Sequence, residues 1–177
     1  MKETELAKYY IEYLSDFDLY FEVDYYRRVD IVAITDNYSA AIEVKTTFNF
    51  KVLEQAIDNK SNFNYSYIAV PKPRDLEFYK KLCYDYGIGL IVLLSTKEVV
   101  EIVRPKLNRS ADNNKLKSRL NEKNKLSIAG AKNGETGVIT AFGCTVENAI
   151  RYIRRHNGVK LSELVSGITH HYRTNQI

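Results

Sequence analysis

The sequence predicts an α/β (α+β) fold in which a mixed sheet lies between helices and a small helical domain follows. Three observations lead to this prediction. Six short segments have the alternating or continuous apolar pattern of β-strands. Two amphipathic segments of helical period separate the later strands, as the crossovers between parallel strands require. Beyond residue 105 the composition becomes basic, and helical patterns return near the end.

The front of the chain is predicted to begin with a helix and three strands. Residues 3–14 carry apolar side chains at helical spacing, and acidic residues occupy the first turn, where they complement the helix dipole. Strands are expected at residues 19–25, 27–34 and 39–47. The stretch "TDNYS" separates the last two strands and consists largely of turn-forming residues.

Two further helices alternate with the remaining strands. Residues 50–60 return to helical spacing, and the strand 65–71 ends at a proline. Residues 75–87 form a helix that ends on glycine, a common C-terminal cap. Residues 88–95 are a continuous apolar run, typical of a central parallel strand, and residues 98–105 add an edge strand. The order α-β-β-β-α-β-α-β indicates helices packed around a mixed sheet.

The rear of the chain is predicted to contain a linker and a second domain. A front domain of residues 1–105 is followed by a basic, Lys- and Asn-rich linker at 106–134 and a small domain at 135–177. In this domain a helix runs from about Thr145, as N-cap, to His156. Asn157-Gly158 then breaks it, "KLSELVSG" forms a short helix, and "THHYRTNQI" begins a third. Short helices joined by a glycine-containing turn are typical of a helix-turn-helix.

Charge and cysteine content restrict the class of protein. Residues 1–105 carry 13 Lys/Arg and 17 Asp/Glu, a net charge of −4, whereas residues 106–177 carry 13 and 5, a net charge of +8. A basic rear half suits a polyanionic partner. No apolar run approaches the length of a membrane span, and the N-terminus lacks a signal-peptide pattern. Cys83 and Cys144 have no metal-ligand spacing, so we expect a cytoplasmic protein that does not bind membranes.

Three ionisable residues interrupt otherwise apolar strands. Asp30 lies in the second strand, and Glu43 and Lys45 lie two residues apart in the third, so they share one face of that strand. If the two strands are antiparallel neighbours, Asp30 can lie across from Glu43. Two converging carboxylates with no soft ligand nearby suit Mg²⁺ or Mn²⁺. An adjacent lysine can orient a water molecule or stabilise charge that develops on phosphorus.

This Asp…Glu-x-Lys arrangement resembles the active site of the PD-(D/E)xK nuclease superfamily, with Val29 where the name of the superfamily has proline. The stretches "ETEL", "VDIVAI", "AIEVKTTFNFKVLEQAID" and "YIAVPKP" are similar to an uncharacterised bacterial family of proposed PD-(D/E)xK phosphodiesterases. The resemblance implies a restriction-endonuclease-like αβββαβ core with a helix-turn-helix-like C-terminal tail. It also implies that Asp30 and Glu43 bind the metal and that Lys45 is catalytic.

The resemblance implies further site residues. An acidic residue on the first helix, either Glu3 or Glu5, would assist the metal site, and Gln55 on the following helix would orient Lys45 or the water. The tail carries residue types that contact phosphates and bases. These are Arg151, Arg154, Arg155, His170, His171, Tyr172, Arg173, Asn175 and Gln176.

The leading hypothesis is therefore a Mg²⁺-dependent nuclease that hydrolyses DNA phosphodiester bonds, with a homodimer as an option because many such cores cut both strands as dimers. Two alternatives stay open. The first is a non-enzymatic DNA-binding regulator that uses the helix-turn-helix-like tail and keeps the core as a scaffold. The second is a protein-interaction module of a phage or defence system, in which the charge asymmetry serves docking.

Overall fold

The front of the chain is an α/β unit built on a six-stranded mixed sheet. The computed structural model describes residues 1–127, 129–130 and 141–168. The strands lie in chain order across the sheet, with β3, β4 and β5 parallel and the remaining pairs antiparallel. They are β1 (Asp18–Tyr25), β2 (Arg27–Ile34), β3 (Ser39–Val44), β4 (Tyr65–Pro71), β5 (Gly89–Leu93) and β6 (Val99–Val103).

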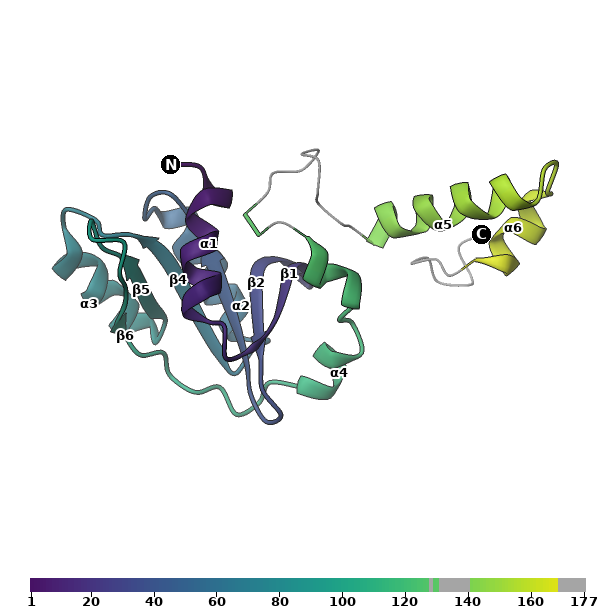
Figure 1. Ribbon diagram of the computed structural model, residues 1–177. Helices are drawn as coiled ribbons and strands as arrows, with labels where there is room; N and C mark the ends of the chain where they lie inside the picture. The colour runs from purple at the N-terminus through teal and green to yellow at the C-terminus, as the bar shows by residue number, and fades with distance from the viewer. Residues whose placement is uncertain (128, 131–140, 169–177) are drawn as a thin grey trace. The chain divides into compact units, whose positions relative to one another are not determined.

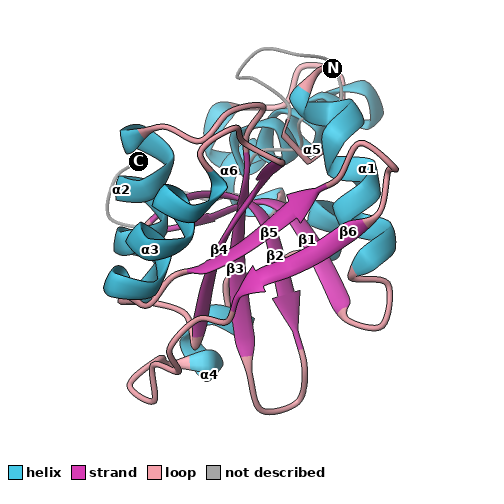
Figure 2. Cartoon of the chain, turned by 90° about the vertical axis from the view of Figure 1, so that its left-hand side faces the viewer, coloured by secondary structure: helices cyan, strands magenta, loops and turns pink. Residues whose placement is uncertain are grey.

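Helices cover both faces of this sheet (Figure 1 and Figure 2). The helix α1 (Glu3–Tyr13) buries Leu6, Ala7 and Tyr10 against one face. The helices α2 (Phe50–Lys60) and α3 (Leu76–Tyr86) cover the other face, where their apolar sides pack against β4 and β5. The crossovers β3–α2–β4 and β4–α3–β5 are what make the three central strands parallel.

The predicted order of elements is confirmed through the sixth strand, with small differences at the ends. Gly87 caps α3 in the left-handed conformation, at φ 67°, as the sequence indicated. The third strand was predicted to reach residue 47, but it ends at Val44. Beyond that point only the amide of Lys45 continues the ladder, by donating to the carbonyl of Ala69 at 3.0 Å, and the chain then turns toward α2.

The basic segment that begins at residue 106 packs on the front unit, which differs from the linker that the sequence suggested. It contains the helix α4 (Asn113–Lys117) and the 3₁₀ helix η1 (Glu122–Leu126). Leu116 is fully buried beside Tyr25 and Phe63. The compact front unit accordingly continues beyond residue 105 through this described segment, and the chain divides into two units between Val138 and Ile139. The composition is polar because most of the segment is surface, while single apolar residues anchor it.

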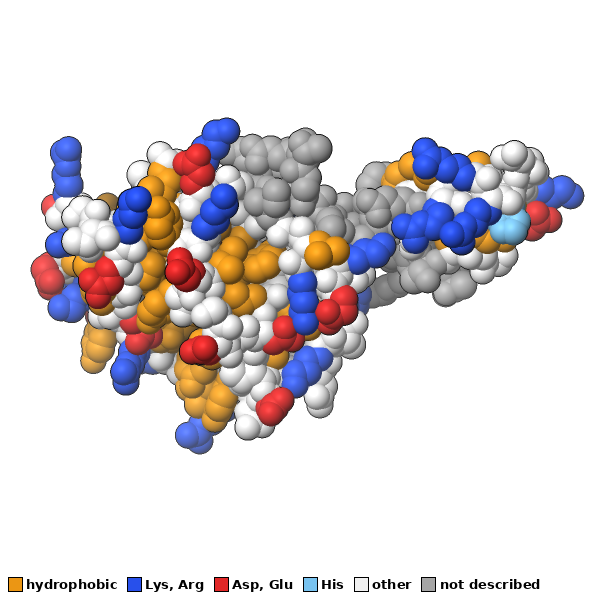
Figure 3. All heavy atoms as spheres, viewed as in Figure 1, with side chains coloured by type: hydrophobic (Ala, Val, Ile, Leu, Met, Phe, Trp, Pro, Cys, Tyr) orange, Lys and Arg blue, Asp and Glu red, His pale blue; other side chains and the backbone are white. Residues whose placement is uncertain are grey.

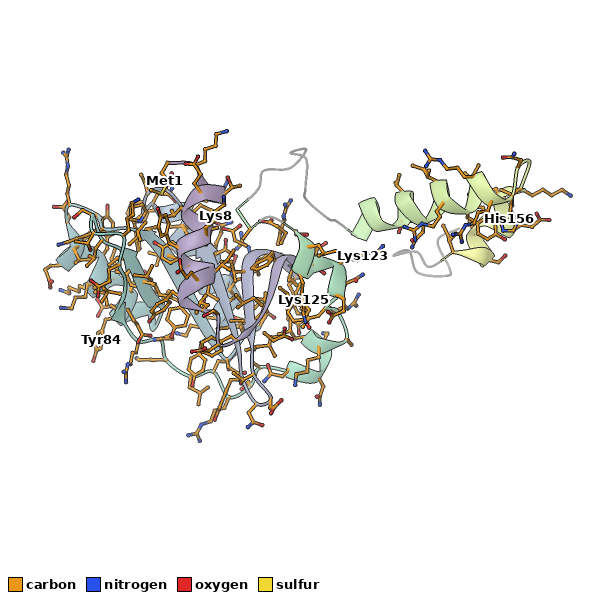
Figure 4. The ribbon with its side chains drawn as sticks, viewed as in Figure 1. Met1, Lys8, Tyr84, Lys123, Lys125 and His156 are labelled. Carbon is orange, nitrogen blue, oxygen red and sulfur yellow. The ribbon has the colours of Figure 1, made fainter. Side chains whose placement is uncertain are left out.

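Side-chain amides and lysines complete the attachment of this segment. The Asn113 amide donates to the Asn64 side chain at 2.8 Å and to the Asn37 carbonyl at 2.9 Å. On η1, Lys125 pairs with Asp18 at 2.9 Å, and its ammonium lies 4.7 Å from the ring centre of Tyr20 (Figure 4). The segment therefore covers part of the sheet next to β1 through many polar contacts and few apolar ones.

The second unit contains the helix α5 (Ala141–Arg155) and the short helix α6 (Leu161–Gly167). The predicted start at Thr145 is wrong, because α5 begins at Ala141 and Thr145 lies inside it. The break at Asn157-Gly158 is confirmed, and Gly158 has φ 79°. At Gly167 an added Cβ would lie 2.5 Å from the ring of Tyr152, so the two helices meet closely there. The third predicted helix, over 169–177, lies outside the described residues.

No helix in the described part of the chain is both long enough and apolar enough to cross a membrane.

The burial of Leu116 gives a test of the revised boundary. We expect Leu116→Ala to lower the free energy of unfolding by about 2–5 kcal/mol, because it leaves a cavity between the segment and the sheet. The matched control is Leu126→Ala in the same segment, whose side chain is 74% exposed. Urea denaturation of both variants would measure the difference. Equal stabilities would show that residues 106–127 do not belong to the folded unit.

Candidate active site

Asp30, Glu43 and Lys45 come together at one end of β2 and β3. The two strands pair from Ile34 opposite Ser39 to Ile31 opposite Ile42, so the next step of this register places Asp30 across from Glu43. Asp30 is 8% exposed, and Glu43 is fully buried. The sequence-based expectation that these carboxylates face each other across the hairpin matches this register.

Lys45 links the two strands through its ammonium group. Its Nζ atom lies 2.7 Å from Asp30 Oδ2 and donates to the Val44 carbonyl at 3.0 Å. The same Asp30 oxygen accepts the Val44 amide at 2.8 Å. Nζ also lies 4.0 Å from Glu3 Oε2 of α1, with both side chains about a quarter exposed. The lysine is thus held between the end of the sheet and the first turn of α1.

The two acidic candidates on α1 have different environments. Glu3 approaches Lys45, as described above. Glu5 is exposed, and its carboxylate accepts the Lys2 amide at 3.0 Å, which caps the start of the helix. The structure therefore places Glu3 beside the site and Glu5 in a capping role at the helix end.

Helix α2 supplies the polar neighbours of Glu43. Asn59 donates its amide to Glu43 Oε1 at 2.8 Å and is itself buried. Gln55 lies one helical turn earlier on the same side of the helix. Three buried oxygens here have no hydrogen-bond donor among the described residues: Glu43 Oε2, Gln55 Oε1 and Asn59 Oδ1. Buried acceptors without a partner are costly, so this cluster lacks either a donor or a cation.

Burial and neighbouring charges shift the protonation equilibria of the site. Burial, followed by the negative charge of Asp30, raises the pKa of Glu43 to about 7. Burial alone would lower the pKa of Lys45, but Asp30, Glu43 and Glu3 together raise it above its ordinary value. Near neutral pH the lysine is therefore a cation, while Glu43 is present in both its protonated and its ionised form.

Sequence reasoning missed two residues of this cluster, Glu22 and Asn59. Glu22 is the residue of β1 that the pairing skips between Phe21–Ile31 and Val23–Val29, its backbone has φ 54°, and it lies close enough to Asp30 for their charges to interact. It is 4% exposed, pairs with Arg28 and accepts the Gly130 amide at 2.6 Å. Burial, followed by the charge of Asp30, raises its pKa to about 7. Counting residues outward from the tight turn at Tyr26 would have found this partner.

The predicted nucleic-acid contacts lie on the second unit. Arg151, Arg154 and Arg155 are exposed on α5. The other six candidates fall outside the described residues; they are His170, His171, Tyr172, Arg173, Asn175 and Gln176.

The oxygen-rich cluster fits a hard divalent ion only with ligands from outside the protein. No group of three or more His, Cys, Asp or Glu side chains in the described ranges is arranged to hold a metal ion. Asp30 and Glu43 would provide two carboxylates, and Mg²⁺ commonly completes such a shell with water and substrate phosphate oxygens. The unpartnered oxygens of Glu43, Gln55 and Asn59 are acceptors, which is the type of atom that a cation or its bound waters would satisfy.

Comparisons of the chain with protein-family models, with curated proteins and with solved structures found no match. The inference about function therefore rests on the residues of this site.

The raised pKa of Glu43 predicts how stability depends on pH. Protonated Glu43 contributes stability that is fully present below its ordinary pKa of 4.5 and is lost as the pH rises through about 7. In the presence of a metal chelator, the free energy of unfolding of Glu43→Gln should therefore equal that of the wild type at about pH 4. At about pH 8 it should exceed the wild-type value by about 1–3 kcal/mol. Urea denaturation across this range measures the difference.

The control for this experiment is Glu54→Gln, an exposed acid on the same helix. It should follow the wild type at every pH. A Glu43→Gln protein that is less stable than the wild type near about pH 8 would mean that Glu43 is stabilised as a carboxylate, contrary to the direction argued here.

Proposed function

We propose that the chain is a metal-dependent phosphodiesterase that hydrolyses DNA, with a restriction-endonuclease-like αβββαβ core. The observation that carries this proposal is the unpartnered buried oxygen of Glu43 beside the Asp30–Lys45 pair, together with unpartnered oxygens on Asn59, which donates to Glu43, and on Gln55, one helical turn earlier on α2. A divalent cation with its bound waters would supply partners for these oxygens. The order of α1, β1, β2, β3, α2 and β4 supports the same core.

The site residues would have two roles, binding a metal ion and stabilising the charge that develops on the phosphate. Asp30 and Glu43 would hold Mg²⁺ or Mn²⁺, which when bound polarises the phosphate and lowers the pKa of water. Lys45 keeps its proton because its pKa is raised, so it is suited to stabilising negative charge on the phosphate oxygens and less suited to acting as a base. The side-chain oxygen of Gln55 can orient a water molecule, and Glu3 holds Lys45 from the α1 side.

The exposed arginines of α5 support DNA as the substrate. Arg151, Arg154 and Arg155 follow one another closely on a helix whose C-terminal half is strongly basic. Arginines of this kind bind phosphates without reading sequence and make affinity dependent on salt. The proposal is that the second unit, with its helix-turn-helix-like pair, brings the core to the duplex.

A second candidate function, a DNA-binding scaffold without catalysis, is favoured by one observation. Glu43 is fully buried, and Asp30 already accepts two hydrogen bonds, so both carboxylates have internal roles. Under this alternative the cluster would only fasten β2 to β3 and to α2.

A cleavage assay separates the two candidates. With Mg²⁺ or Mn²⁺, we expect the wild type to cut plasmid, linear, single-stranded or branched DNA. Glu43→Gln and Lys45→Ala should each reduce the rate by roughly 100-fold or more, because the first removes a carboxylate that would hold the metal ion and the second removes the positive charge that stabilises the transition state. Glu54→Gln and Lys51→Ala, exposed residues of matched type on α2, should keep the wild-type rate. Intact DNA binding with no cleavage of any substrate would contradict the enzyme and favour the scaffold.

Salt dependence tests the proposed DNA contacts of α5. Replacing Arg151, Arg154 and Arg155 by alanine should weaken binding equally for different DNA sequences. It should also reduce the slope of log affinity against log salt by up to about 3, because each phosphate contact contributes about 0.9. In the control, alanine replaces the exposed residues Arg74, Lys80 and Lys81, so that the same amount of positive charge is removed. Equal effects of the two triple variants would show that only net charge matters.

A further inference from the structure

An aromatic pocket opens at the end of the sheet opposite the candidate active site. It has a volume of about 340 Å³ and is walled by α1, the β2–β3 hairpin and the strands β4, β5 and β6. Thr35 and Ser39, at the two ends of the hairpin turn, line it, whereas Lys45 follows the other end of β3. Hydrophobic side chains gather on the face that carries α1 (Figure 3). The volume is within the range of small-ligand sites.

Tyrosines and a phenylalanine form most of the wall. The aromatic residues that line the pocket are Tyr13, Phe17, Tyr38, Tyr65 and Tyr67. Three of them are unusually exposed for their size: Tyr13 at 45%, Phe17 at 43% and Tyr38 at 47%. The ring centres of Tyr38 and Tyr65 lie 5.9 Å apart at an angle of 47°, so the two rings pack together into a continuous aromatic wall. Aromatic faces carry negative charge density and attract cations within about 6 Å.

One charged group lies in the wall. Among the described residues that line the pocket, Glu101 alone is ionisable at neutral pH. The Tyr67 hydroxyl donates to Glu101 Oε1 at 2.9 Å, which fixes the carboxylate, and Arg104 lies 3.3 Å from Oε2. The Arg104 side chain is 90% exposed, so this ion pair is weak and a ligand cation could compete with it for Oε2.

We propose that this pocket binds a small organic cation with an apolar body, such as an amine or a quaternary ammonium compound. The aromatic faces and the Glu101 carboxylate both favour positive charge, and the apolar walls favour a hydrocarbon body. The same lining disfavours phosphates and carboxylates, because no lysine or arginine among the described lining residues would neutralise them. The inference does not depend on the phosphodiesterase proposal.

Choline and its neutral isostere 3,3-dimethylbutan-1-ol test this inference, since they share shape and differ in charge. Titration followed by NMR should show choline binding to the full chain, with shifts in the residues that line the pocket. The neutral alcohol should bind at least about tenfold more weakly, because it lacks the cation–π attraction. Glu101→Gln should weaken choline binding by a similar factor while it still accepts the Tyr67 hydroxyl. Glu98→Gln, an exposed acid outside the pocket, should have no effect.

Tyr38→Ser is a second variant that keeps the fold, because the Tyr38 backbone, and not its ring, bonds to Thr35. It should also weaken choline binding. Equal affinity for choline and the alcohol would overturn the inference, since it would show a merely apolar cavity. A lack of shifts with choline at high millimolar concentration would overturn it too. The inference would also be overturned if a second copy of the chain occupied the pocket. Light scattering would then show a dimer that the Tyr38→Ser substitution dissociates.

Discussion

The bond between the Asp30 carboxylate and the end of β3 is the constraint on which the site depends. Regular pairing of β2 with β3 stops at Ile31 and Ile42, and from there one side-chain oxygen takes over. Asp30 Oδ2 accepts both the Val44 amide and the Lys45 ammonium, so a side chain closes the ladder where the backbone no longer does. Because this oxygen fixes Lys45, it also sets the distance between the lysine and Glu3 on α1.

Three buried or nearly buried acids surround this bond, and their mutual repulsion must be offset. Asp30 lies near Glu22 on one side and Glu43 on the other, and burial, followed by the charge of Asp30, raises the pKa of both to about 7. Arg28 and the Gly130 amide satisfy Glu22, whereas Glu43 has Asn59 on one oxygen and no described donor on the other. Both oxygens of Glu22 therefore have hydrogen-bond partners, whereas Glu43 keeps one buried oxygen that a ligand would have to satisfy.

The sequence predicted the sheet well because hydrophobic periodicity and turn residues are local signals. It also predicted that Asp30, Glu43 and Lys45 lie close together, because strand alternation and the register of a hairpin are sufficient for that prediction. It did not show the attachment of residues 106–127, because one buried leucine and a few asparagines do not produce a periodic pattern. It missed Asn59 because an amide that serves a buried acid looks like any polar helix residue. The choice between Glu3 and Glu5 needed the helix cap, which depends on a single turn of backbone.

The two proposed sites lie at opposite ends of β2 and β3 and would have opposite chemistry. At one end a lysine and unpartnered oxygens suit a phosphate with its divalent ion. At the other, aromatic rings and one carboxylate suit a cation. A strand that is buried on both faces cannot change the direction of its side chains without breaking its register. Ile42, which lines the pocket, is also the last residue of β3 that pairs with β2 before Asp30 takes over.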